Sequence, residues 1–321
     1  MTFGSGEFMY EEIPNWAQIP PTWQVREISG VAVDSQDRVY ALGRGQDPVA
    51  LFDSDGQFLS AWGGDRFGRA HNIFIGPDDL VYCVDDLGHR VFKFTPEGDL
   101  LLTIESKNRH ADDTPLTGRG QVVEKVHPPF NYPTGVALSP QGDLYVSDGY
   151  GNARVHKFAA DGTLLFSWGS FGAAPGQFYL PHGVLVDPEG RVYVSDRMNR
   201  RIQVFTPEGE YLAQWDDVRW PDNACMDGEG NIYVAELGSL FLGGGTADLS
   251  HPPGRVTVRD PQGTILAEWG MIDPLGAGRF FAPHDIAVDS QGSLYIGEAA
   301  STYSRGTAPA DWPMLRKYVR V

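Results

Sequence analysis

Three of the eight histidines occupy the same position in short, related stretches of the chain. Each begins an apolar run that continues into a turn and then into a strand-like segment rich in Val, Ile and Tyr. If the fold brings these positions together, three imidazoles leave coordination sites open for water or substrate, as catalytic zinc sites do. We therefore predict that a divalent transition metal, with zinc expected, is bound by His71, His182 and His284.

Two further side chains lie where they could act beside such a metal. Arg44 and Tyr150 each follow the second strand-like segment of a repeat. The guanidinium of Arg44 offers a planar fork that suits a substrate carboxylate. The phenol of Tyr150 could accept a proton if a neighbouring cation stabilises its phenolate. The other five histidines share no position in the repeat, and we expect them in loops or at the surface.

The related stretches belong to an internal repeat that occurs six times. Successive copies are separated by 42, 63, 48, 40 and 62 residues, so some copies carry insertions. A copy reads as four short strands joined by Pro- and Gly-containing hairpin turns. Four antiparallel strands repeated at this interval are typical of a β-propeller blade. The copies begin at Ser29, His71, Thr134, His182, Asp222 and His284.

This pattern predicts an all-β, six-bladed propeller that forms a single domain over residues 9–321, with residues 1–8 an added leader outside it. The sixth copy lacks its outermost strand, and Met9–Trp16 resembles the fourth-strand segment of the fourth copy. We therefore expect this N-terminal segment to complete the last blade and to close the ring, because an unpaired strand edge is otherwise left open. In the fourth copy the strands are expected at 183–186, 191–195, 201–205 and 211–215.

The order of the strands predicts which face of the propeller carries function. The residue that opens the first strand and the connection after the second strand lie on the same face. Alternate blades of six are related by about 120°, so the three histidines should form a triangle at the mouth of the channel. Long loops gathered on one side of a rigid scaffold usually carry function. Three long insertions are expected on this face: 106–131, 239–253 and 300–313.

Composition and charge exclude several kinds of partner. The formal net charge is −17 and no basic cluster exceeds two residues, whereas a nucleic-acid partner requires a basic surface. No apolar run reaches the roughly 18–20 residues of a membrane span, and no signal peptide is visible. Cys83 and Cys225 are expected to be buried free thiols. We therefore expect a cytoplasmic monomer without nucleic-acid or membrane partners.

Several motifs resemble those of known families. The runs Asp148-x-x-x-Asn152-x-Arg154 and Asp196-x-x-Asn199-x-Arg201 resemble the Asp/Asn/Arg signature of the NHL repeat, and we expect most of these residues to be structural. Over roughly residues 10–320 the chain resembles peptidyl-α-hydroxyglycine α-amidating lyase. The motifs that carry this resemblance are Ser29–Asp34 with Arg44, Ser147–Arg154, Leu180–Gly183, Asp196–Gln203 and Pro283–Ile286.

This resemblance implies a lyase that cleaves the C–N bond of a carbinolamide, R–CO–NH–CH(OH)–COO⁻, to an amide and glyoxylate. The substrate would be a small molecule or a peptide-terminal α-hydroxyamide. The three histidines would hold catalytic zinc, Tyr150 would be the base and Arg44 would bind the carboxylate. Arg201 would match a second arginine near the site. A structural calcium, which takes oxygen ligands, would match Asp285 and the backbone carbonyls of Val31 and Ile73.

Two other functions stay open at this point. The same tri-histidine metal could serve a lyase or hydrolase that acts on another small hemiaminal or ester. Gly151 and Ala282 favour this alternative, because they replace a cysteine and a methionine of the animal enzymes. The chain could also be a non-catalytic binding scaffold, as many NHL propellers are. Metal analysis of the purified protein would separate a scaffold from an enzyme.

Overall fold

The computed structural model describes residues 1–105, 129–238, 253–270, 278–304, 308–309 and 311–321. These residues form six antiparallel sheets, five with four strands and one with five, and the fold is the predicted six-bladed β-propeller. The chain divides into two compact units. Unit 1 comprises Met1–Asp65 and Asp222–Val321, and unit 2 comprises Arg66–Pro221.

Unit 2 contains blades two, three and four, in each of which the strands follow chain order across the sheet. Blade two consists of β7 (Ala70–Ile75), β8 (Val81–Asp85), β9 (Arg90–Phe94) and β10 (Leu100–Glu105). Blade three consists of β11 (Gly135–Leu138), β12 (Leu144–Asp148), β13 (Arg154–Phe158) and β14 (Leu164–Trp168). Blade four consists of β15 (Pro181–Val186), β16 (Val192–Asp196), β17 (Arg201–Phe205) and β18 (Tyr211–Trp215), with the 3₁₀ turn η2 (Arg197–Asn199) after β16.

Unit 1 contains blades one, five and six. Blade one consists of β3 (Val25–Val33), β4 (Val39–Gly45), β5 (Val49–Phe52) and β6 (Phe58–Trp62), followed by the 3₁₀ turn η1 (Gly64–Arg66). Blade five consists of β19 (Pro221–Met226), β20 (Ile232–Glu236), β21 (Arg255–Arg259) and β22 (Ile265–Trp269). Blade six has the order β1-β2-β25-β24-β23. Its strands are β1 (Thr2–Ser5), β2 (Phe8–Ile13), β23 (Pro283–Val288), β24 (Leu294–Glu298) and β25 (Leu315–Arg320), and helix α2 (Ala300–Ser304) follows β24.

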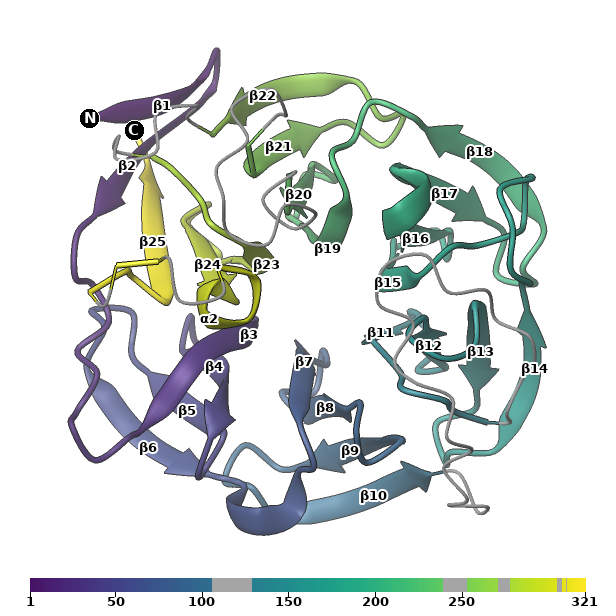
Figure 1. The fold of residues 1–321 in the computed structure, drawn as a ribbon, viewed down its shortest axis with the longest axis horizontal. Coiled ribbons are helices and arrows are strands. Elements are labelled where there is room, and N and C mark those ends of the chain that lie inside the picture. The colour runs from purple at the N-terminus through teal and green to yellow at the C-terminus, as the bar shows by residue number, and fades with distance from the viewer. Residues whose placement is uncertain (106–128, 239–252, 271–277, 305–307, 310) are drawn as a thin grey trace. The chain divides into compact units, whose positions relative to one another are not determined.

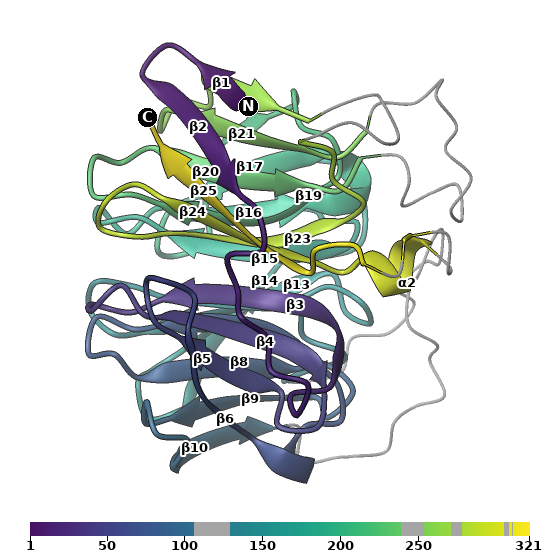
Figure 2. The ribbon, with the colours of Figure 1, turned by 90° about the vertical axis from the view of Figure 1, so that its left-hand side faces the viewer.

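The N-terminal segment completes blade six, as the sequence predicts. Strand β2 pairs antiparallel with β25, with Tyr10 opposite Arg320, and the two ends of the chain lie close together (Figures 1 and 2). The ring of Tyr10 stacks on Trp269 at 5.1 Å and is fully buried. Residues 1–8, which the sequence analysis leaves outside the domain, contribute β1 and the first residue of β2. Phe3 and Phe8 from this segment are buried in the core of unit 1.

A buried carboxylate ends the second strand of five blades and fixes the segment that enters the blade. In blade two, Asp85 accepts hydrogen bonds from the backbone N–H groups of Gly68 and Arg69 and pairs with Arg90 of the third strand. Removal of one partner would leave a buried charge uncompensated, which costs about 3–5 kcal/mol. The five carboxylates, none of them exposed, are Asp85, Asp148, Asp196, Glu236 and Glu298.

The structure also bears on the predictions for the two cysteines, for membrane spans and for the long insertions. Cys83 and Cys225 are free cysteines, and burial raises the pKa of both thiols. The described helices lack the length and apolar character that a membrane span requires. Of the three insertions, 106–128, 239–252, 305–307 and residue 310 lie outside the described residues, while 300–304 form α2.

Candidate metal centre

The three histidines lie at equivalent places on the first strands of their blades. Each is the second residue of its strand, β7, β15 or β23, and each is fully buried. The pairing between the first and second strands shifts register at this point in all three blades. A β-bulge of this kind locally twists a strand and redirects a side chain. The register shift therefore explains why the three histidine side chains depart from the alternating orientation of side chains along a regular strand.

For two of the histidines, a contact with a backbone carbonyl indicates which ring nitrogen carries the proton. Nδ1 of His71 lies 2.8 Å from the carbonyl oxygen of Thr134, and Nδ1 of His284 lies 2.8 Å from that of Ser29. A carbonyl only accepts, so each Nδ1 carries the proton and Nε2 carries the lone pair. Such an outer hydrogen bond is the usual way in which proteins orient a histidine ligand for a metal.

Tyr150 lies against two of the histidines within unit 2. Its hydroxyl is 3.0 Å from Nε2 of His71 and 3.3 Å from Nε2 of His182. The two imidazole centroids are 4.8 Å apart, and the phenol ring meets both edge to face. The Tyr150 hydroxyl therefore lies between ring nitrogens of two candidate metal ligands, where it would be close to a cation bound by them.

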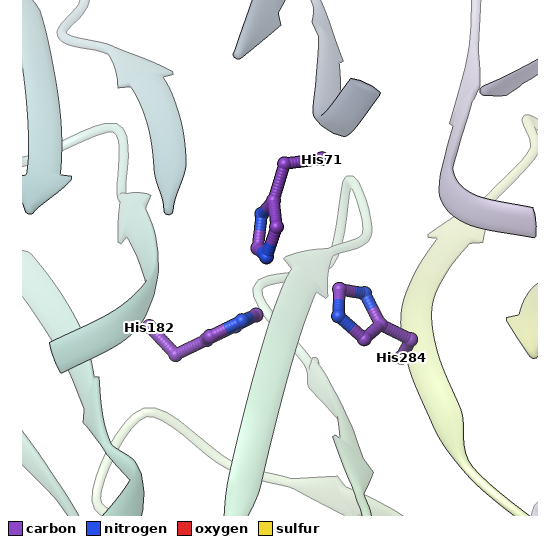
Figure 3. A group of neighbouring side chains, drawn as sticks. All are labelled: His71, His182 and His284. Carbon is purple, nitrogen blue, oxygen red and sulfur yellow. The ribbon is translucent and has the colours of Figure 1, made fainter. Parts of the chain in front are cut away.

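Among the described residues, His71, His182 and His284 form a buried group that could hold a metal ion (Figure 3). Their potential ligand atoms lie within 4.8 Å of one another. The donor set, three imidazoles of which two have Nδ1 held by a backbone carbonyl, fits a divalent transition metal.

Two buried aspartates that the sequence analysis did not single out as site residues lie beside these ligands. Oδ2 of Asp86 is 4.0 Å from Nε2 of His71, and the Asp86 carboxylate also binds the guanidinium of Arg69. Oδ2 of Asp222 is 3.9 Å from Nε2 of His284. Negative charge at this distance favours a cation. Asp222 could have been found from its alignment with the histidines, and Asp86 from its place directly after the second strand.

Arg44 lies in unit 1, at the end of β4, where it pairs with a carboxylate of the protein. Its Nη1 donates to Oε1 of Glu27 at 2.5 Å and to Oγ1 of Thr302 at 2.8 Å. The Arg44 side chain is largely buried. The substrate contact predicted for Arg44 stays a prediction, and Glu27 is a partner that the sequence analysis missed.

Arg201 is held entirely by protein groups of blade four. Its Nε donates to Asp196, Nη1 donates to Ala173 O and Gln214 Oε1, and Nη2 donates to Ala174 O and Gln177 O. These five contacts use all five N–H groups of a guanidinium. In this conformation Arg201 contributes to the framework of blade four, and the role near the substrate predicted for it stays a prediction. Burial raises the pKa of its partner Asp196 to about 6, although the hydrogen bonds from Asn199, Tyr179 and Arg201 oppose that shift.

A different arginine of blade four occupies the position that Arg44 holds in blade one. Arg197 directly follows the strand-two carboxylate Asp196, and Arg44 directly follows Gly43, which takes that place in β4. Arg197 is fully buried in η2. Its position directly after Asp196 is visible in the sequence, although Arg197 is not among the predicted site residues.

Two of the residues predicted for calcium, Asp285 and Val31, contact each other across neighbouring blades. In unit 1, Asp285 accepts hydrogen bonds from the backbone N–H groups of Val31 and Ile286, both at 3.0 Å. Ile73 is buried on β7 of unit 2. Calcium binding by Asp285 and the carbonyls of Val31 and Ile73 stays a prediction.

The six blades and the buried histidine group define a β-propeller with a candidate metal centre. The model of the NHL repeat matches residues 130–158 and 178–205. Human NHL repeat-containing protein 3 is 30% identical over 284 residues, which cover 84% of this chain and 75% of that protein. The chain belongs to the NHL-repeat family.

Other relatives carry the names of amidating enzymes. Peptidyl-alpha-hydroxyglycine alpha-amidating lyase 1 of Drosophila melanogaster is 28% identical over 268 residues, 78% of this chain and 46% of the relative. The peptidylglycine alpha-amidating monooxygenase of Rattus norvegicus is 27% identical over 344 residues, 92% of this chain and 31% of the relative. The chain thus spans less than half the length of these two relatives.

Among solved structures, the chain is similar to a catalytically inactive variant of virginiamycin B lyase from Staphylococcus aureus with quinupristin. The TM-score is 0.60 at 14% identity, and the match covers 98% of this chain and 100% of the other. At this identity the likeness concerns the fold alone.

Proposed function

We propose that the protein is a metal-dependent lyase that cleaves the C–N bond of a carbinolamide to an amide and glyoxylate. The observation that carries this proposal is the Tyr150 hydroxyl within hydrogen-bond distance of Nε2 on both His71 and His182. A tyrosine in contact with two candidate metal ligands would be suited, as the phenolate, to take a proton from a substrate hydroxyl. The relatives named as amidating lyases support the same reaction class.

His71, His182 and His284 would hold the cation, with zinc expected. When bound, it would supply the positive charge that makes the substrate hydroxyl more acidic. The carbonyl oxygens of Thr134 and Ser29 hold two of these imidazoles in their orientation. Such preorganisation matters because a ligand that rotates freely would place the charge poorly.

The reaction requires one proton to move from oxygen to nitrogen. Tyr150, as the phenolate, accepts the proton of the substrate hydroxyl. The electron pair of that O–H bond becomes the second bond of the glyoxylate carbonyl, and the C–N pair leaves with the amide nitrogen. That nitrogen then takes a proton, for which the Tyr150 phenol is a suitable donor. No electrons pass to or from a redox cofactor, and Arg44 would orient the substrate carboxylate.

The direct test is turnover of α-hydroxyhippurate by the zinc-loaded protein. We expect release of benzamide and glyoxylate in equal amounts, measured by chromatography and by a glyoxylate-specific assay. Protein stripped of metal should lose this activity and regain it when zinc is restored. Zinc-loaded protein that releases neither product would contradict the proposal. Purified protein that binds no transition metal would instead favour a non-catalytic scaffold.

A further inference from the structure

A glutamate of this protein binds the arginine that we assign to the substrate carboxylate. Glu27 lies on β3 and is 3% exposed. Its Oε1 accepts hydrogen bonds from Nη1 of Arg44 and from Oγ1 of Thr302, both at 2.5 Å. Its Oε2 accepts the backbone N–H of Thr302 at 2.7 Å. Both carboxylate oxygens of Glu27 therefore accept hydrogen bonds, as the oxygens of a substrate carboxylate bound to Arg44 would.

This ion pair is not the one that the blades repeat. In the repeated arrangement, a carboxylate at the end of the second strand pairs with an arginine of the third strand, as in Glu298 with Arg316. In blade one the position of this carboxylate on the second strand is occupied by Gly43 of β4, which has no side chain. Glu27 comes from the first strand, and Arg44 lies near the end of the second. The pair therefore needs an explanation other than the framework of the blade.

Helix α2 joins this pair to a candidate metal ligand within unit 1. The helix lies against β3, where Oγ of Ser301 donates to the carbonyl oxygen of Arg26 at 2.7 Å (Figure 1). The next residue, Thr302, binds both Glu27 and Arg44. The residue after that, Tyr303, lies parallel to the His284 imidazole, with centroids 6.4 Å apart and planes at 29°. Glu27 is thus linked to the candidate metal ligand His284 through Thr302 and the adjacent Tyr303.

We propose that Glu27 is a specificity-determining residue that competes with the substrate carboxylate for Arg44. This inference rests on the proposed function, in which Arg44 is the carboxylate anchor. A guanidinium already paired with a carboxylate attracts a second carboxylate weakly, because the two anions repel each other. Specificity is commonly built from such a repulsive element. Glu27 should therefore weaken the binding of the carboxylate-bearing substrate relative to a site without this glutamate, and it should not affect ligands with an uncharged group at that position.

The test compares the binding of two unreactive analogues, hippurate and its uncharged carboxamide hippuramide, by titration calorimetry of the zinc-loaded protein. In the Glu27→Gln variant we expect the Kd of hippurate to fall about tenfold, a change of about 1.4 kcal/mol, while the Kd of hippuramide is unchanged. The matched control is Glu12→Gln, which removes a carboxylate that pairs with Arg316 in the same unit. This control should change neither Kd.

Equal hippurate affinity in wild type and Glu27→Gln would overturn the inference, and so would weaker hippurate binding in the variant. Should Glu27→Gln fail to fold, Thr302→Val removes one of the three hydrogen bonds to Glu27 and should shift the ratio of the two Kd values in the same direction. In the variant Glu27→Gln/Arg44→Gln the gain for hippurate should disappear. These experiments measure binding and not turnover. A failure of this inference can therefore be distinguished from a failure of the lyase proposal, which turnover of α-hydroxyhippurate tests.

Discussion

At the residue scale, the hydroxyl of Tyr150 has two imidazole nitrogens as neighbours and can donate a proton to only one of them. A cation held by these two imidazoles would lie close to the hydroxyl and would stabilise its phenolate form. The acid–base role proposed for Tyr150 therefore depends on the proposed metal.

Replacing Tyr150 by Phe removes the hydroxyl and keeps the ring. We expect kcat for α-hydroxyhippurate to fall about 10²-fold or more, the range typical of a lost general base. Zinc content should stay near the wild-type value, as measured by mass spectrometry. Full activity in this variant would rule out Tyr150 as the base. Loss of zinc together with activity would instead make Tyr150 a ligand.

At the element scale, first strands with a register shift present the histidines, and β2 closes blade six. The closing strand brings Tyr10 into a cluster with Trp269 and with Tyr233, whose hydroxyl is 3.5 Å from that of Tyr10. Because Tyr10 is fully buried against these two residues, which belong to β22 and β20, its ring packs the closing strand of blade six against blade five. The stability of unit 1 should therefore depend on this one aromatic side chain.

We expect Tyr10→Ala to lower the free energy of unfolding by about 3–5 kcal/mol, the range for a large aromatic residue removed from a core. Tyr10→Phe keeps the packed ring and removes only the hydroxyl, so it should cost much less. Urea denaturation followed by tryptophan fluorescence measures both values. An equal loss in the two variants would show that the hydrogen bond dominates. Little loss in either would show that β2 adds little to the blade.

The repeat pattern accounts for how well these elements could be predicted. Strands of the fourth copy begin and end within two residues of their predicted positions, because Pro/Gly turns and alternating apolar residues mark both ends. Strand β2 could be predicted because it resembles a fourth strand. Strand β1 could not, since a fifth strand belongs to no copy of the repeat, and nothing in the pattern required Phe3 to be buried.

At the scale of the whole molecule, the site could be predicted only as far as the repeat relates its residues. The histidines and Tyr150 were found because they share positions in different copies. Glu27 and Asp86 were missed because each depends on a side-chain contact, with Arg44 and with Arg69, that strand periodicity does not encode. Arg201 was chosen for its motif, but the hydrogen bonds that it makes inside blade four are a property of the folded chain.

Metal binding should also affect the stability of the molecule as a whole. A ligand present at 100 times its Kd stabilises the folded state by about 2.7 kcal/mol. Removal of zinc by a chelator should therefore lower the Tm by a few degrees, and added zinc should restore it. In His182→Ala the chelator should have little effect, whereas His89→Ala, which alters a histidine outside the group, should behave as wild type. A Tm that does not depend on zinc in the wild-type protein would contradict the predicted metal centre.

The pairing of β2 with β25 also constrains the order in which the molecule can be assembled during synthesis. Unit 2 is one continuous segment, whereas unit 1 combines the first 65 residues with the last hundred. Blade six needs Tyr10 and Arg320 side by side, so β2 leaves the ribosome long before its partner strand β25. At about 5–20 residues per second, that interval is at least about 15 s. During this time the edge of β2 that pairs with β25 is open, and the aromatic residues Phe8 and Tyr10 lie in reach of chaperones or of another nascent chain.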